Sequence, residues 1–227
     1  MKRRIAFLMA LLMAVGLLGG CNSFSKFSDN SKDYGPYVKS LLDMAYKNDT
    51  TKYLELVDDT KTSADQTYEE NMEYWGLYLG YSFEIETEYL NDSAINDRLT
   101  KLAKDIFAKA KYETADAVKT DDYYTVKVTI EPILFIDTAY DEAEAYVTDM
   151  VAKAENGDFG DLQNDENAYY DWEMEYAKGM LDILESYVDK IEYGTAISKI
   201  VEIEVDEDEM YGISDDSMIE LQNALLQ

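Results

Sequence analysis

The sequence predicts an α+β fold in which several helices pack on a small antiparallel sheet. Apolar residues recur every three or four positions over most of the chain, which is the helical period. They alternate with polar residues near 112–130 and 197–213, as in strands with one buried face. The predicted order is helices, a hairpin, more helices, a second hairpin and a final helix. This order differs from the regular strand–helix alternation of a parallel sheet.

Four helices are expected before the first hairpin, over 37–46, 51–57, 64–83 and 93–110. Pro36 suits an early helical position, where its missing N–H would have no partner. The third helix carries an apolar stripe at spacings of four, three and four residues, formed by Tyr68, Met72, Trp75 and Leu79. The fourth helix has Asp92 or Ser93 as its N-cap, and Lys109 and Lys111 suit the negative end of its dipole.

The first hairpin is expected from strands over 112–118 and 124–130, joined by a turn at Asp121 and Asp122. In the second of these strands, Tyr124, Val126, Val128 and Ile130 alternate with polar residues. Pro132 ends this strand, because proline cannot donate a hydrogen bond within a central ladder.

The rest of the chain is expected to form helices over 140–154 and 167–187, strands over 197–205 and 210–213, and a final helix over 215–226. Short segments also echo one another, such as Tyr37-Val-Lys-Ser and Tyr146-Val-Thr-Asp. The echo makes a weak internal duplication one alternative, with 37–136 and 137–227 as the two halves.

The N-terminus carries a motif of its own. A basic start precedes an apolar run from Ile5 to Leu18, followed by Leu18-Gly-Gly-Cys21. This arrangement is typical of a secretory signal, and the run is shorter than the roughly 20 apolar residues of a membrane-spanning helix. Cys21 is the chain's single cysteine, so it cannot form an internal disulfide. The motif resembles the lipobox of bacterial lipoproteins.

The lipobox resemblance implies that the Cys21 sulfur receives a diacylglyceryl group and that a signal peptidase cuts between Gly20 and Cys21. Residues 1–20 would be the signal peptide, 21–36 the lipidated cysteine with a flexible tether, and 37–227 a single α+β domain. The mature protein would be anchored to the outer face of the cell membrane through lipid on Cys21. The alternative is an ordinary cleaved signal peptide that happens to contain a cysteine.

The charge narrows the classes of partner. Residues 1–20 contain three basic and no acidic residues, so their removal takes the net charge from −28 to −31. Such a chain repels phosphates, which excludes nucleic acid as a partner and leaves cationic partners such as metal ions, basic peptides or basic proteins. Alternatively, the acidic surface simply keeps an extracellular protein soluble.

The composition also limits the chemistry. Histidine is absent, which excludes serine–histidine and cysteine–histidine catalysis and histidine metal ligands. The acidic clusters at 158–165 and 206–209 are candidates for calcium, but an EF-hand loop starting at Asn156 would put Gly160 at a ligand position and Asp161 at the glycine position. We therefore predict no catalytic, cofactor-binding or metal-ligating residues and no cofactor.

Tyrosine is abundant, with 20 copies in the chain. Tyr74, Tyr78 and Tyr81 lie partly off the apolar stripe of their helix, and Tyr169 and Tyr170 stand at the head of another. An exposed aromatic patch of this kind can bind glycan, peptide or protein at low entropic cost. The alternative is that each ring packs inward and leaves its hydroxyl in water.

The signal, the tether, the helical N-terminal part and the segments Lys111-Tyr-Glu-Thr-Ala and Tyr124-Thr-Val-Lys-Val-Thr-Ile-Glu-Pro132 resemble uncharacterised lipoproteins of Gram-positive, clostridia-type bacteria. That resemblance implies an NTF2-like or cystatin-like domain. The anchor and the missing catalytic residue types favour a non-catalytic module that binds an unknown protein or small ligand, through an NTF2-like concavity or a helical face. The alternatives are an enzyme that uses carboxylates on cell-wall glycan or peptide and a solute-binding receptor, which the absence of strand–helix alternation disfavours.

Overall fold

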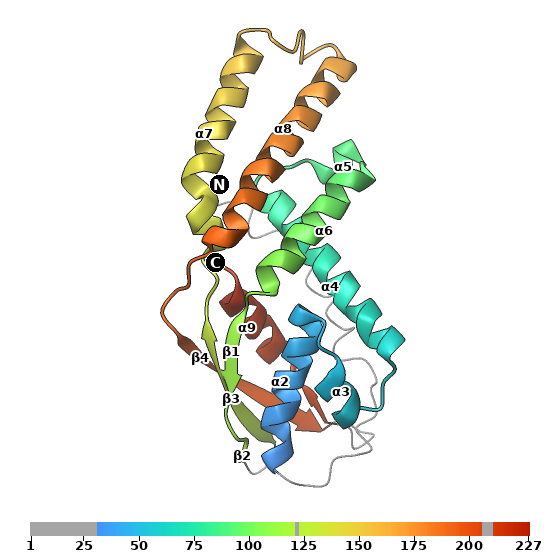
Figure 1. The fold of residues 1–227 in the computed structure, drawn as a ribbon, viewed down its shortest axis with the longest axis vertical. Coiled ribbons are helices and arrows are strands. Elements are labelled where there is room, and N and C mark those ends of the chain that lie inside the picture. The colour runs from blue at the N-terminus through green and yellow to red at the C-terminus, as the bar shows by residue number, and fades with distance from the viewer. Residues whose placement is uncertain (1–30, 121–122, 206–210) are drawn as a thin grey trace. The chain divides into compact units, whose positions relative to one another are not determined.

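A computed structural model describes residues 31–120, 123–205 and 211–227 (Figure 1). It confirms the α+β class, with helices packed on an antiparallel sheet. The α-helices are α2 (Ser31–Lys47), α3 (Thr51–Leu56), α4 (Lys61–Ser82), α5 (Thr87–Leu90), α6 (Ser93–Phe107), α7 (Phe135–Glu155), α8 (Glu166–Tyr187) and α9 (Asp215–Leu225). A short 3₁₀ helix, η2 (Val188–Lys190), follows α8. Within the described residues, no helix is both long and apolar enough to cross a membrane.

The strands are β1 (Lys111–Thr114), β2 (Val118–Lys119), β3 (Tyr124–Glu131), β4 (Ile197–Val205) and β5 (Tyr211–Ile213). They follow the order β1-β3-β4-β5, with β2 also paired to β3. Both predicted hairpins are present, and antiparallel pairing of β3 with β4 joins them, from Tyr124 opposite Ile203 to Ile130 opposite Ile197. The strand predicted over 112–118 is divided into β1 and β2, and between them Ala115 donates its N–H to the Lys127 carbonyl.

The chain forms two compact units, each built from segments that are distant in sequence. The first contains the described residues within Met1–Tyr68, Tyr112–Ile130 and Ala196–Ala224. The second contains Glu69–Lys111, Glu131–Thr195 and Leu225–Gln227. The units therefore do not coincide with the halves 37–136 and 137–227 that a simple duplication would give.

In the first unit, α2 begins six residues before the predicted start and includes Pro36. Tyr34 is fully buried, and its ring lies 4.4 Å from the ring of Tyr124 on β3. The Gly35 carbonyl accepts a hydrogen bond from Thr114 Oγ1 at 3.0 Å. Residues 31–36 are thus helical, and the prediction that the tether reaches residue 36 is wrong over this stretch, because the buried Tyr34 ring holds the segment against the sheet.

In the second unit, α4 and α6 pack closely. A Cβ on Gly76 would lie 2.8 Å from backbone atoms of Leu99 and Thr100, so the two helices meet where α4 has no side chain. Asp92 caps α6 as predicted, accepting hydrogen bonds from the N–H groups of Ala94 and Ile95. Helix α6 ends at Phe107, however, so Lys109 and Lys111 lie beyond it rather than in its last turn.

Three further features of the second unit differ from the prediction. Helix α7 begins at Phe135, five residues early, because the buried Phe135 and Ala139 extend its apolar face toward the N-terminus. The single-turn α5 and η2 were not predicted, since each is too short to show a helical period. Helices α7 and α8 form an antiparallel pair (Figure 1).

Candidate functional site

The predicted lipidation and cleavage residues, Cys21 and Gly20, lie outside the described residues. The acidic cluster at 206–209 does too. Among the residues that the structure describes, no three acidic, histidine or cysteine side chains are grouped in a way that could hold a metal ion.

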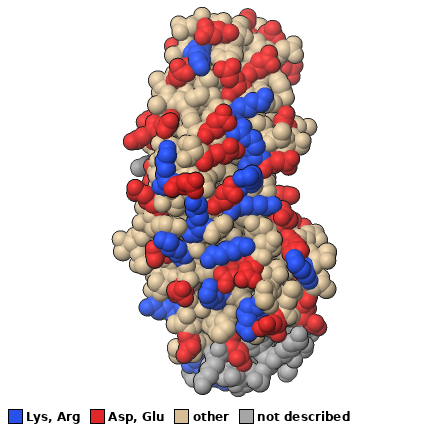
Figure 2. Space-filling view, viewed as in Figure 1, with Lys and Arg blue, Asp and Glu red and all other residues tan. Residues whose placement is uncertain are grey.

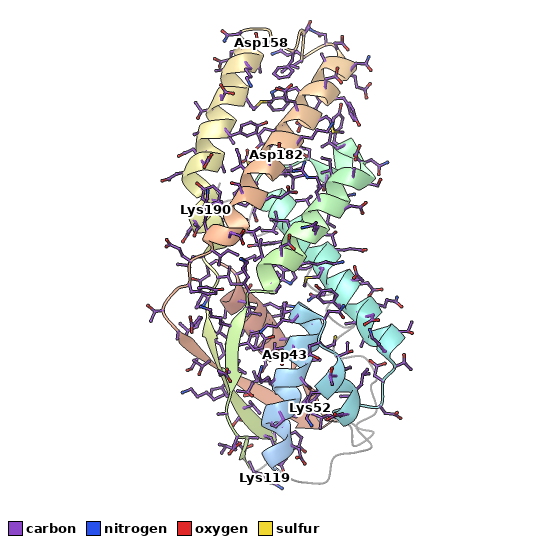
Figure 3. The ribbon with its side chains drawn as sticks, in the orientation of Figure 1. Asp43, Lys52, Lys119, Asp158, Asp182 and Lys190 are labelled. Atoms are coloured by element: carbon purple, nitrogen blue, oxygen red, sulfur yellow. The ribbon has the colours of Figure 1, made fainter. Side chains whose placement is uncertain are left out.

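Two acidic side chains of the 158–165 cluster, Asp161 and Asp165, act in a local turn and a helix cap. The Asp161 carboxylate accepts hydrogen bonds from the N–H groups of Gln163 and Asn164 and from Asn164 Nδ2, which lowers its pKa, with the Asn164 side chain as the largest cause. Asp165 caps α8 by accepting from the N–H groups of Asn167 and Ala168. Asp158 stands at the far end of the α7–α8 pair (Figure 3).

The tyrosines singled out as possible contact residues have different surroundings. Tyr74 and Tyr78 are half-buried, and their rings meet Trp75 edge-on at 5.8 and 5.3 Å. Tyr81 is 41% exposed. Tyr169 and Tyr170, in contrast, are brought together with Tyr89 of α5, a residue that the sequence did not single out.

We call Tyr89, Tyr169, Tyr170 and Trp172 the Tyr89 cluster. The Tyr89 ring lies 5.1 Å from that of Tyr169 and 6.2 Å from that of Tyr170, in edge-on and tilted arrangements. Tyr89 and Tyr170 are 38% and 37% exposed, so their rings reach solvent. Tyr89 Oη also donates a long hydrogen bond of 3.5 Å to the Glu166 carbonyl. The cluster joins α5 to the first turns of α8 and presents aromatic surface outward.

Beneath the cluster, the rings continue into a rigid base. Trp172 stacks on Tyr176 at 5.9 Å, and Tyr176 stacks on Tyr146 of α7 at 5.8 Å. The buried Tyr176 Oη donates to the Phe83 carbonyl at 2.9 Å. Tyr146 Oη donates to the Glu175 carbonyl at 3.0 Å, and it fits there because α8 carries Gly179 at this point: a Cβ would lie 2.1 Å from that hydroxyl. Hydrogen bonds and stacking therefore fix the rings that support the cluster.

A buried carboxylate lies among these rings. Glu173 is 3% exposed, and the Tyr169 hydroxyl donates to it. Burial raises the pKa of Glu173, the Tyr169 hydrogen bond lowers it, and the nearby charge of Glu86 raises it further. In return, the hydrogen bond to Glu173 and then burial raise the pKa of Tyr169 to about 12. Glu173 lies four residues after Tyr169 and three before Tyr176, so the helical period places it on the buried face of α8. Its burial was missed because an acidic side chain is not expected on such a face.

The electrostatic environment of the cluster is acidic. Desolvation and the charges of Glu166 and Glu173 raise the pKa of Tyr89. The chain has no lysine or arginine between Lys61 and Arg98 or between Lys153 and Lys178, the two stretches that supply the cluster, while acids are frequent in both. Figure 2 shows fewer basic than acidic side chains over the far ends of α7 and α8.

Two described cations from α6 and α7 pair with acids of α7 and α8 outside the Tyr89 cluster, and Lys178 of α8 itself is exposed. Arg98 of α6 donates from Nη2 to Asp182 at 2.6 Å and from Nε to Glu185 at 2.9 Å (Asp182 labelled in Figure 3). Lys153 of α7 pairs with Asp149 at 3.0 Å. These cations neutralise charge elsewhere on the helices.

The fold resembles that of a solved protein, although the sequence matches no known family. No protein-family model matches the chain, and no curated protein matches its sequence. A solved structure that it resembles is a candidate lipoprotein of Bacillus subtilis, ycdA, with a TM-score of 0.58 at 15% sequence identity. The similarity covers 86% of this chain and 56% of that protein, so this chain spans little more than half of its length. The likeness confirms an α+β fold shared with that protein, whereas the NTF2-like or cystatin-like assignment stays a prediction.

Proposed function

We propose that this chain is a lipid-anchored protein of the outer face of the cell membrane and that its folded part is a non-catalytic binding module. The observation that carries the proposal is the N-terminal motif, a basic start and short apolar run that end in Leu18-Gly-Gly-Cys21. Two acyl chains on Cys21 supply about the number of buried methylenes that stable anchoring requires. The resemblance in fold to a candidate lipoprotein of Bacillus subtilis supports this location.

The binding part of the proposal rests on the Tyr89 cluster. Its rings are partly exposed and stand on a stacked base, so a partner would meet aromatic surface that is already ordered. Rigid aromatic residues lose little conformational entropy on binding, which is why they are favoured as contact groups. This surface suits a partner outside the cell membrane, either a protein or a small ligand.

The alternative of a carboxylate enzyme is less well supported. Glycoside hydrolysis needs two carboxyl groups that both reach the scissile bond. Glu173 is the carboxylate with a raised pKa in the cluster, yet it is buried and already accepts a hydrogen bond from Tyr169. Its surroundings favour a role in holding the rings over a role in proton transfer to substrate.

The anchor is tested by intact-mass measurement of the protein extracted from bacterial cells. We expect a chain that begins at Cys21 and carries a diacylglyceryl-sized addition. The Cys21→Ser variant should lose both the addition and membrane retention, while Ser23→Ala, which keeps the sulfur, should behave as the parent. An unmodified mature chain in the medium would contradict the anchor.

The binding module is tested by cross-linking on intact cells, followed by recovery of the protein under several growth conditions. We expect a partner whose recovery falls when Tyr89 and Tyr170 are both replaced by alanine. Recovery of the same partner in equal amount from that variant would show that the cluster is not the binding surface.

A further inference from the structure

Several tyrosine rings of this chain, outside the Tyr89 cluster, are in contact with lysine ammonium groups. The Lys111 ammonium lies 3.5 Å from the Tyr193 ring centroid, Lys190 lies 3.8 Å from that of Tyr187, and Lys47 lies 4.4 Å from that of Tyr112. All are within the roughly 6 Å over which a cation is attracted to an aromatic face. The chain repeatedly satisfies its tyrosine faces with its own lysines.

The Tyr89 cluster differs in this respect. Within the described part of the chain, no lysine or arginine lies over the rings of Tyr89, Tyr169 or Tyr170. The two segments that supply these rings contain no basic residue at all. They do contain acids, and Glu86, Glu166 and Glu173 act electrostatically on the cluster.

We propose that the Tyr89 cluster binds the arginine or lysine side chains of a basic segment in another exported protein. The argument is charge complementarity: aromatic faces and carboxylates attract the same cationic group, and their attractions add. An arginine fits best, because its planar guanidinium can stack on a ring while its N–H groups reach a carboxylate. This inference rests on the proposed function for its location outside the cytoplasm.

Other classes of ligand would interact with the rings or with the carboxylates, but not with both. A neutral glycan can stack on the rings but gains nothing from the net charge of the carboxylates. Nucleic acid and anionic lipid are repelled by a chain of net charge −28. A small metal ion would not use the rings, and the described acids are not grouped as metal ligands.

In the test, the mature protein extracted from cells is titrated with a capped Arg-Gly repeat peptide at 0.15 M salt. Tryptophan fluorescence is a suitable readout because Trp172 belongs to the cluster, and calorimetry supplies the affinity. We expect replacement of both Tyr89 and Tyr170 by alanine to weaken binding by about tenfold or more. Tyr89→Phe, which keeps the aromatic face, should retain most of the affinity.

The matched control is a second exposed tyrosine of the same unit. Tyr140 on α7 is 40% exposed, and its hydroxyl lies 3.5 Å from a Glu144 oxygen. Tyr140→Ala and Glu144→Gln should leave binding unchanged, whereas Glu166→Gln should weaken it. Unfolding curves of all variants check that each remains folded.

Several results would overturn the proposal. These are no binding of the arginine peptide, equal losses from the Tyr89 and Tyr140 variants, or equal binding of a Ser-Gly peptide or a chitin oligosaccharide. Because the titration does not depend on lipid, its failure and the failure of the anchor are distinguishable. A protein that binds the peptide but reaches the medium unmodified would overturn only the location.

Discussion

Tyr112 in the first unit and Tyr89 in the second show two uses of the same residue types. Tyr112 is 5% exposed, and Lys39 and Lys47 of α2 lie 5.3 and 4.4 Å from its ring centroid. Its hydroxyl donates to Asp43 of the same helix at 2.9 Å, and Asp43 pairs with Lys39 at 3.0 Å (Asp43 labelled in Figure 3). The ring, the hydroxyl and the carboxylate of this site are therefore all contacted by groups of the chain itself.

Tyr89 has acids and rings around it but no described cation over its face. The difference lies in spacing: Lys39, Asp43 and Lys47 recur every four residues on one face of α2, whereas the segments around Tyr89 lack basic residues. We infer that the Tyr112 site, whose partners belong to the chain itself, contributes to stability. The Tyr89 site leaves its ring faces available to a partner.

The largest expected effect comes from removing each ring. Tyr112→Ala should lower the free energy of unfolding by about 3 to 5 kcal/mol, as for large buried aromatic residues. Tyr89→Ala should change it by no more than about 1 kcal/mol, because the ring is partly exposed. Urea unfolding measures both, and equal losses would contradict the distinction between the two sites.

A smaller, pH-dependent effect is expected at Glu173. Its pKa is raised in the folded protein, so the folded state binds its proton more tightly than the unfolded state does. The stability that this contributes is present in acid and is lost as the pH rises above the usual glutamate value of about 4.3. Glu173→Gln should therefore unfold at higher urea concentration than the parent at pH 7, and the gain should shrink toward pH 4.

The control for that prediction is Glu175→Gln, two residues further along α8 and exposed. It should not reproduce the gain. The prediction is contradicted if the urea midpoints of the parent and of Glu173→Gln respond identically to pH. Glu173 would then titrate as an ordinary surface group.

The smallest effect is expected where the second unit does supply a cation. Arg98 is 29% exposed at its side chain and bridges Asp182 and Glu185, which are 73% and 42% exposed. Arg98→Lys loses the two-armed geometry and should cost about 0.5 to 1 kcal/mol in urea unfolding. Lys101→Ala, which breaks an exposed pair with Asp105, should change little. A larger loss at Lys101 would reverse this ranking.

Much of the fold follows from the local pattern. The stripe Tyr68, Met72, Trp75 and Leu79 is buried as its helical spacing requires, and Asp92 caps α6. What could not be predicted depends on contacts distant in sequence. Tyr34 extends α2 by packing on Tyr124, and β3 pairs with β4 across some 70 residues.

The candidate site was predicted only in part. Tyr169 and Tyr170 were singled out as one possible contact patch, and both rings lie beside Tyr89, with Tyr170 exposed and Tyr169 half-buried. Tyr89 belongs to a single-turn helix, which no period reveals, and its place beside α8 is a tertiary contact. Glu173 is buried against Tyr169 on the apolar face of α8, where an acidic side chain is not expected.

The seating of Tyr146 over Gly179 has a practical consequence for engineering. If α7 slid by one turn along α8, this hydroxyl would meet a side chain and lose its carbonyl acceptor, so the register of the pair is set far from the turn that joins the helices. That turn contains Gly157 and Gly160 at positive φ and is largely exposed. A tag or reporter domain spliced in beside Gly157 would thus leave the helices aligned, making this turn the preferred insertion point for imaging the protein in place.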